Sequence, residues 1–312
     1  MRSGNLIESI GNTPLVELPS YSPRPGVRIF AKLEGANPTG SVKDRIARAM
    51  MRAAQEAGAL TKDRAILEPT SGNTGISLAM VTGCMGYRFT AVMPDNVSPE
   101  RTELLRAYGA EIIYSPGAEG SNGSIAMAKR LVEAEPGRYT MLYQYGNAGN
   151  PGAHYETTGP EIIRDLPEVT HFVAGLGTGG TLMGTGRRLK EYNPAVKIIA
   201  AAPAPDDKIQ GLRALEEGFV PPILDLDKLD ARLMVGGEES FRMTAAMLRR
   251  EGVFAGVSSG AVLAAAVRVA SRLEQGNIVC LFADGGWKYQ STGLWTREYK
   301  EMEGSIEGKI WW

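Results

Sequence analysis

The stretch HFVAGLGTGGTL, residues 171–182, joins a short apolar run to a glycine-rich turn and then to the start of a helical pattern. The apolar run indicates a buried strand, and helical periodicity continues from Thr181 to Tyr192. The same order recurs along the chain, where short apolar runs alternate with longer amphipathic stretches. This alternation predicts an α/β fold with a mostly parallel sheet.

Periodicity also places the individual elements. We expect strands at 28–32, 65–67, 89–93, 111–114, 171–174, 197–201 and 278–283. We expect helices at 43–56, 75–85, 99–108, 125–133, 155–166, 181–192, 240–251 and 261–273. The Pro- and Gly-rich stretch 145–152 predicts a crossing between domains, and a loop that faces a cleft is expected to begin at 202–207.

Composition limits the kinds of partner. The chain has 312 residues, 43% apolar and 22% charged, which is typical of a soluble protein with one large core or two domains. Its net charge of -1 and the lack of a basic run predict no nucleic-acid partner. The apolar stretch 260–267 is too short to span a bilayer, and the N-terminal residues lack the apolar core of a signal peptide. We therefore expect a cytoplasmic protein with no membrane partner.

Cysteine and histidine are scarce. Cys84 and Cys280 lie in apolar surroundings without a CxxC pattern, so we expect two buried free thiols and neither a disulfide nor a metal site. No histidine lies near either cysteine in sequence, which argues against a catalytic thiol.

The glycine-rich turn of residues 175–181 has three interpretations. Its backbone N–H groups could wrap a phosphate at the start of the following helix. The spacing of Gly175, Gly177 and Gly180 also matches a dinucleotide fingerprint, which requires an acidic residue at the end of the next strand. The nearest acids, Asp206 and Asp207, lie beyond two prolines, which favours a single phosphate. The third interpretation is a tight turn that needs glycine for its backbone alone.

A second motif, GVSSG at 256–260, fits the nucleophile elbow of hydrolases. That chemistry needs a histidine after the serine in chain order. His154 and His171 are the only histidines, and both precede Ser258. The hydrolase interpretation therefore fails, which leaves Ser258 as a serine at a strand-to-helix turn or as an ordinary loop serine.

A third turn, TSGNTG at 70–75, places hydroxyls, an amide and backbone donors between a predicted strand and a predicted helix. Such a group at a helix N-terminus suits a carboxylate or another small anion. An N-cap alone would need only one of these hydroxyls.

The segment GSVKDR at 40–45 places a lysine at the unfavourable end of a helix. Ser41 is expected to be the N-cap and Asp44 to complete a capping box, so that Lys43 lies in the first turn. The partial positive charge there disfavours an ammonium group by up to about 1 kcal/mol. Without the other motifs, an exposed first-turn lysine would explain this segment.

Four motifs together lie in the order and spacing of one family. GSVKDR, TSGNTG, GTGGT (177–181) and GVSSGA (256–261) resemble the cysteine synthase family of pyridoxal phosphate enzymes. The resemblance runs from IGNTPL at 10–15 to the C-terminal tail. It implies two doubly wound α/β domains with the cofactor in the cleft between them, in a homodimer. Residues 40–146 would form the smaller domain, and residues 1–39 and 147–312 the larger one.

The resemblance also implies roles for individual residues. Lys43 would be the catalytic lysine that forms an internal aldimine with the cofactor, and a helix N-terminus would lower its pKa for that role. Asn73 would bond the ring hydroxyl oxygen, and Ser258 would face the pyridine nitrogen. The loop of Gly177, Thr178, Gly179, Gly180 and Thr181 would hold the phosphate. The substrate carboxylate would be held by Thr70, Ser71, Gly72, Thr74 and Gln144, and no metal is implied.

The implied reaction is β-replacement. An activated serine would lose its β substituent, and a sulfur nucleophile would attack the resulting aminoacrylate. A serine hydroxyl at the pyridine nitrogen makes the ring a weaker electron sink than a carboxylate would, which favours β-elimination over transamination. The same fold could instead support a serine or threonine dehydratase or a cystathionine-forming enzyme, and the glycine fingerprint leaves a nicotinamide-dependent dehydrogenase as an alternative.

Within the family the chain is most similar to the B type, and especially to the actinobacterial O-phosphoserine sulfhydrylases. The similarity lies at 209–213, 217–221, 283–293 and the tail 306–312. Arg213 would meet the leaving phosphate, because a guanidinium pairs well with a dianion. O-acetylserine is the alternative substrate, since B-type enzymes that use it also carry an arginine here. The sulfur donor is left open between sulfide, thiosulfate and a small thiocarboxylated carrier protein. The tail, which ends in two tryptophans, would enter the active-site cleft or pack elsewhere on the protein.

Overall fold

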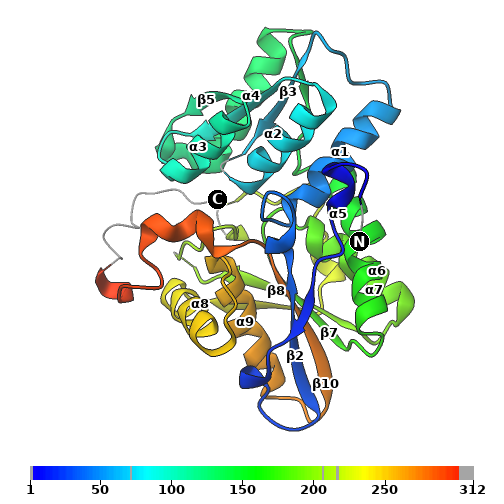
Figure 1. The fold of residues 1–312 in the computed structure, drawn as a ribbon, viewed down its shortest axis with the longest axis vertical. Coiled ribbons are helices and arrows are strands. Elements are labelled where there is room, and N and C mark those ends of the chain that lie inside the picture. Colours follow the sequence, from blue (N-terminus) through cyan, green and yellow to red (C-terminus); the bar gives the residue numbers. More distant parts are fainter. Residues whose placement is uncertain (1–2, 71, 206, 216–217, 302–312) are drawn as a thin grey trace.

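The computed structural model describes residues 3–70, 72–205, 207–215 and 218–301. Two sheets organise this part of the chain (Figure 1). The larger has the strand order β1-β2-β10-β7-β8-β9, with bounds β1 Leu15–Glu17, β2 Val27–Leu33, β7 His171–Gly175, β8 Lys197–Pro203, β9 Ala231–Val235 and β10 Gly276–Phe282. The smaller has the order β5-β4-β3-β6, with bounds β3 Ala65–Pro69, β4 Phe89–Pro94, β5 Glu111–Ser115 and β6 Tyr139–Met141.

The predicted α/β class with mostly parallel sheets is confirmed. Only β1 pairs antiparallel among the described strands, with Leu15 opposite Lys32. The two sheets lie in different parts of the molecule, as expected for two doubly wound domains (Figure 1). The residue boundaries proposed for these domains stay a prediction.

Except for α5, which was not predicted, the helices are close to their predicted places. Their bounds are α1 Lys43–Glu56, α2 Asn73–Met85, α3 Pro99–Ala107, α4 Gly120–Ala134, α5 Gly149–Ala153, α6 Gly159–Asp165, α7 Gly180–Tyr192, α8 Gly237–Glu251 and α9 Val257–Ala270. The predicted helix 155–166 differs most, because a π-helical turn, η5 at His154–Thr158, separates α5 from α6. None of the helices in the described ranges is long and apolar enough to cross a membrane.

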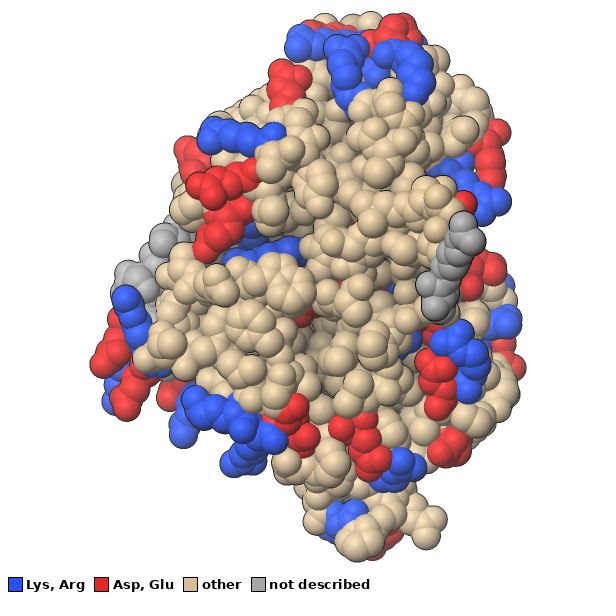
Figure 2. All heavy atoms as spheres, viewed as in Figure 1, with Lys and Arg blue, Asp and Glu red and all other residues tan. Residues whose placement is uncertain are grey.

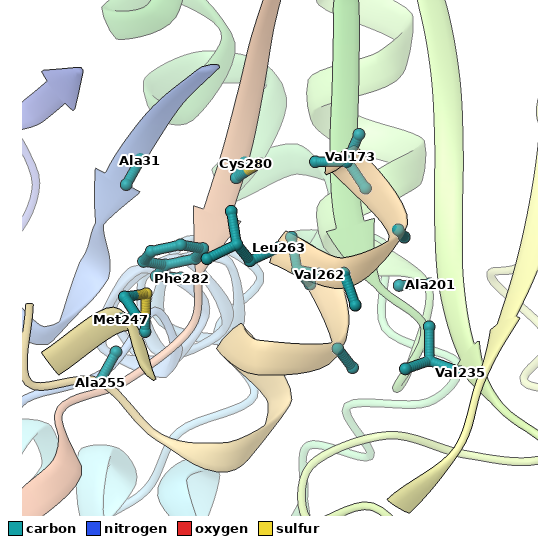
Figure 3. Packing of buried hydrophobic residues seen from close by; sticks show 14 of the residues in the cluster. Ala31, Val173, Ala201, Val235, Met247, Ala255, Val262, Leu263, Cys280 and Phe282 are labelled. Carbon is teal, nitrogen blue, oxygen red and sulfur yellow. The ribbon is translucent and has the colours of Figure 1, made fainter. Parts of the chain in front are cut away.

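The large sheet is covered on both faces, because alternate residues of its strands point to opposite sides. Val173 and Cys280 pack with α9 on one face, whereas Phe172 and Val279 pack with α6 and α7 on the other. Figure 3 shows the α9 side, where Val262 and Leu263 lie against the strands. A strand buried on both faces reads as a continuous apolar run, which is why these strands were predictable.

Two sequence expectations are wrong in detail. The N-cap of α1 is Val42 and not Ser41, and the Asp44 carboxylate accepts the backbone N–H of Thr39 at 2.7 Å and not that of Ser41. Asp44 also accepts a hydrogen bond from the Ser77 hydroxyl at 2.5 Å, so its carboxylate belongs to a buried hydrogen-bond network.

Cys280 is buried as expected, but Cys84 is exposed near the C-terminal end of α2.

Charged side chains are mixed over the surface. Figure 2 shows acidic and basic residues interspersed on the visible face, without a large area of one sign.

Candidate active site

A cavity lies at the carboxyl ends of the large sheet's central strands, where open α/β sheets usually bind ligands. The residues that follow β7 and β10 line it, together with the first residues of α1, α2 and α9. Seven of the eight predicted cofactor residues meet there: Lys43, Asn73, Gly177, Thr178, Gly179, Thr181 and Ser258. Gly180 lies directly beside them, at the first position of α7.

Backbone pairing places Lys43 in the cavity wall. The N–H of Val42 donates to the carbonyl of Ala283 at 2.8 Å, and Ser41 bridges Asp284. The segment before α1 is therefore fastened to the end of β10, and the helix starts at the cavity. Burial lowers the pKa of the Lys43 ammonium to about 8, and the Asp284 carboxylate opposes part of that shift. Burial is therefore the main reason for the lowered pKa, whereas the sequence analysis attributed a lowered pKa to the helix N-terminus.

The glycine-rich turn of residues 175–181, here called the glycine loop, leads into the N-terminus of α7 and exposes backbone groups there. Gly179 has a φ of +88°, a left-handed conformation that glycine adopts without strain. A Cβ on Gly180 would lie 1.8 Å from Oδ1 of Asn150, so a side chain there would not fit. The Asn150 amide also donates to the Thr178 hydroxyl at 3.0 Å. Helix N–H groups and hydroxyls in this arrangement suit a phosphate, so these residues fit the phosphate of the cofactor.

His154 contacts this loop through Thr181, and the sequence analysis did not identify it as a site residue. Its Nε2 lies 3.2 Å from the Thr181 hydroxyl, and its Nδ1 lies 2.9 Å from the Thr158 hydroxyl. The pKa of His154 is held well below 6.5, mainly by burial and also by the charges of Arg45 and Lys43. A neutral imidazole therefore links the π-helical turn to the glycine loop.

Asn73 is held by two charged groups that the sequence analysis also did not assign to the site. Its amide donates to the Asp284 carboxylate at 2.7 Å and accepts from the Lys288 ammonium at 2.6 Å. The Tyr289 hydroxyl donates to the same oxygen of Asp284 at 2.7 Å. The only sequence signal was charged residues directly after a buried strand.

Ser258 lies in the first turn of α9, where it is buried and lines the cavity. A Cβ on Gly211 would lie 3.6 Å from its hydroxyl, and Gly211 has a φ of +85°. The loop at 209–213 therefore closes over Ser258 with a glycine.

The predicted carboxylate-binding residues form a neighbouring cluster before and within α2. The Thr70 hydroxyl accepts the N–H groups of Gly72 at 3.3 Å and Gly75 at 3.2 Å. The Thr74 hydroxyl donates to the Gln144 side chain at 2.7 Å. Thr70, Gly72, Thr74 and Gln144 are thus brought together beside Asn73, whereas Ser71 lies outside the described residues.

Arg213 lies apart from the cavity lining, two residues beyond Gly211. Its guanidinium stacks over the ring of Phe219 at 4.8 Å and over that of Tyr145 at 5.5 Å. It also donates to the side chain of Asn122 at 3.3 Å, on the first turn of α4. Arg213 is 7% exposed, so it is a largely desolvated cation, two residues along the chain from a residue of the cavity lining.

The fold and this arrangement define a class of protein. Residues 6–284 match the family of pyridoxal-phosphate dependent enzymes. A probable cysteine synthase of Bacillus subtilis is 42% identical over 304 residues, which cover 94% of this chain and 97% of that protein. Cysteine synthase B of Salmonella typhimurium is 41% identical over 295 residues, with coverage of 94% and 97%.

The solved structures agree with these sequences. The crystal structure of a cysteine synthase from Entamoeba histolytica superposes with a TM-score of 0.89 at 35% identity, covering 96% of this chain and 92% of that one. The chain belongs to the cysteine synthase family of pyridoxal-phosphate dependent enzymes. Its cofactor is accordingly pyridoxal phosphate and not a nicotinamide dinucleotide.

Proposed function

We propose that this protein makes L-cysteine by β-replacement, in which a sulfur nucleophile takes the place of the β substituent of an activated L-serine. The observation that carries the proposal is the single cavity in which Lys43, the glycine loop and Ser258 meet. The cysteine synthases among its relatives support the same reaction.

The cofactor would be held at three points. The residues Gly177 to Thr181 would bind its phosphate, the Asn73 amide would contact the ring hydroxyl oxygen, and Ser258 would face the ring nitrogen. When bound, pyridoxal phosphate supplies the electron sink that makes the α-proton of an amino acid acidic. Ser258 offers a hydroxyl and no negative charge, which matches the modest sink that β-elimination requires.

Lys43 would move the proton. A pKa of about 8 leaves roughly one amine in ten neutral at pH 7, so Lys43 can accept the α-proton near neutral pH. The substrate carboxylate would be bound by Thr70, Ser71, Gly72, Thr74 and Gln144. The Gln144 backbone N–H donates to the Glu68 carboxyl group at 2.9 Å, and this hydrogen bond fixes the backbone of Gln144 within the cluster.

Arg213 favours O-phospho-L-serine over O-acetyl-L-serine as the activated substrate. Its planar guanidinium is held by two aromatic rings, and a phosphate dianion gains more from it than a neutral acetyl group does. The enzyme would then release phosphate as the transferase reaction proceeds.

The test compares both substrates on one preparation. The holoenzyme is mixed with O-phosphoserine or O-acetylserine and sulfide, and cysteine formation and the visible spectrum are followed. We expect cysteine from both and a kcat/KM at least about tenfold higher for O-phosphoserine. The opposite preference would retain the reaction and overturn the phosphate assignment. Release of ammonia and a keto acid without cysteine would favour a dehydratase, and a Lys43→Ala control should form no product.

The sulfur donor and the assembly belong to the same proposal. Sulfide, thiosulfate and a thiocarboxylated carrier protein are assayed as donors in parallel, and the donor with the highest kcat/KM identifies the sulfur source.

We propose by analogy with the family that the protein is a homodimer. Light scattering of the holoenzyme tests this proposal. The predicted role of the tail at 306–312 concerns residues outside the described ranges.

A further inference from the structure

The Asn73 side chain lies between a buried cation and a buried anion. The Lys288 ammonium contacts its Oδ1 at 2.6 Å, and the Asp284 carboxylate contacts its Nδ2 at 2.7 Å. Lys288 and Asp284 are each 2% exposed. Water therefore has little access to either contact, and the protein alone determines how the amide is oriented.

The two partners permit one orientation of the amide. An ammonium group only donates hydrogen bonds, and an ionised carboxylate only accepts them. A flipped amide would direct its NH2 group at Lys288 and its oxygen at Asp284, so both hydrogen bonds would be lost. Burial lowers the pKa of Lys288 to about 8, with the Asp284 and Asp44 charges opposing, so most of its ammonium is present at pH 7.

The partner of the amide's donor side, Asp284, lines the cavity, whereas the partner of its acceptor side, Lys288, does not. Asn73 itself is also one of the lining residues. The NH2 group has two hydrogens, and Asp284 takes one of them. The remaining N–H makes no hydrogen bond with the described residues, so it can donate to an acceptor oxygen in the cavity.

We propose that Lys288 and Asp284 are positioning residues that fix the Asn73 amide as a hydrogen-bond donor toward the ring hydroxyl oxygen of the cofactor. This inference rests on the proposed role of Asn73 at that oxygen. A donor in this position stabilises the ionised form of the ring oxygen, because an anionic acceptor forms the stronger hydrogen bond. The two residues would thereby set which protonation form of the bound cofactor predominates.

One short segment carries both groups. Asp284 follows β10, and Lys288 and Tyr289 belong to the 3-10 helix η8, Gly286–Thr292. The Tyr289 hydroxyl holds the Asp284 carboxylate at 2.7 Å. The segment is itself fixed to the start of α1, since the N–H of Gly285 donates to the carbonyl of Gly40 at 3.2 Å. Both charged groups that orient the Asn73 amide therefore come from one segment that is anchored to the start of α1.

The experiment measures the visible absorption bands of the bound cofactor in the holoenzyme without substrate. Lys288→Met and Lys288→Gln should change the ratio of the two band intensities by about tenfold toward the form with a neutral ring oxygen, the effect of one charged hydrogen bond. Lys288→Arg keeps a donor-only cation and should retain most of the wild-type ratio. Circular dichroism shows which variants are folded, and the ratio is compared among those.

A double-mutant cycle separates positioning from a general change of charge. In an Asn73→Ala background, Lys288→Met should produce no further change in the band ratio, because Lys288 acts through the amide. Additive changes, or an unchanged ratio in the folded single variants, would overturn the inference. No sulfur donor is present, so this outcome is independent of whether the enzyme makes cysteine. Conversely, the expected ratios without cysteine formation would overturn only the proposed reaction.

Discussion

The hydroxyl of Thr181, in the first turn of α7, lies 3.2 Å from Nε2 of His154. The other ring nitrogen lies 2.9 Å from the Thr158 hydroxyl, within the π-helical turn. If Thr158 donates to Nδ1, then Nε2 carries the proton and donates to Thr181, which leaves the Thr181 hydrogen free for the phosphate. π-Helical turns are frequent at functional sites, and this one brings a histidine to the glycine loop, the proposed phosphate site.

We expect His154→Leu to weaken cofactor binding about tenfold, the effect of one hydrogen bond to a charged acceptor. His154→Gln retains a side-chain donor and should recover part of that loss. Fluorescence titration of the cofactor-free protein measures the affinity. The matched control is His171→Gln, because His171 lies at the start of β7, away from the cavity, and should leave the affinity unchanged. Equal losses at both histidines would contradict the prediction.

The reactivity of Lys43 should depend on pH with a midpoint of about 8. Labelling of the cofactor-free protein with an amine reagent, followed by peptide mass analysis, resolves Lys43 from Lys288. Asp284→Asn should move the Lys43 midpoint to lower pH, because the lost carboxylate no longer stabilises the ammonium. A midpoint near 10.5 in the wild-type protein would show that burial does not act as inferred.

Arg213→Ala should raise the KM for O-phosphoserine at least about tenfold and leave the KM for O-acetylserine nearly unchanged. Steady-state kinetics with both substrates on one preparation measure the difference. O-acetylserine is the internal control, since any general damage to the cavity would affect both. A uniform loss would assign Arg213 to the packing of Tyr145 and Phe219.

Arg45 is completely buried and pairs with two carboxylates, through Nε to Glu34 at 2.7 Å and through Nη1 to Glu161 at 2.7 Å. Arg45→Met should lower the free energy of unfolding by about 3–5 kcal/mol, because it leaves the Glu34 carboxylate buried without a cation. Glu161 would keep its second cation, Lys32. Urea denaturation measures the change. The control Arg52→Met removes an exposed pair with Glu56 on the same helix and should cost about 0.5 kcal/mol or less.

Glu161 makes the same network sensitive to acid. Burial raises its pKa, but hydrogen bonds and charges from Arg45 and Lys32 outweigh burial and lower the pKa from 4.5 to about 2. A depressed folded pKa contributes stability above pH 4.5 that is lost as the pH falls toward 2. Glu161→Gln should therefore flatten the decline of the unfolding free energy in this window. An unchanged slope would show that Glu161 is not the group that titrates.

The helices and strands that could be predicted from the sequence are those that show a local pattern of apolar residues. The bounds of α1 match because its apolar residues repeat with helical spacing, and the central strands match because they are continuous apolar runs. β1 and β6 have three residues each, too few to show a period, and the edge strand β9 mixes polar and apolar residues. These three strands were therefore not predicted.

The missed parts of the site depend on contacts between distant segments. Asn73 meets Asp284 across 211 positions and Lys288 across 215, and no local pattern encodes either pairing. The capping box failed for the same reason, because Asp44 is drawn away from Ser41 by Ser77, which lies on α2. The resemblance to a family supplied the residues proposed to contact the cofactor, but the side chains proposed to orient them became visible only in the folded chain.

The position of β10 determines when the site can form during protein synthesis. This strand, Gly276–Phe282, lies between β2, made near the start of the chain, and β7. The four strands of the smaller sheet are complete by Met141 and can pair while the ribosome is still translating. The larger sheet stays split until β10 is inserted, so Lys43, made early, faces an unfinished cavity for most of translation. Pyridoxal phosphate should therefore bind after synthesis of the enzyme and not to the growing chain.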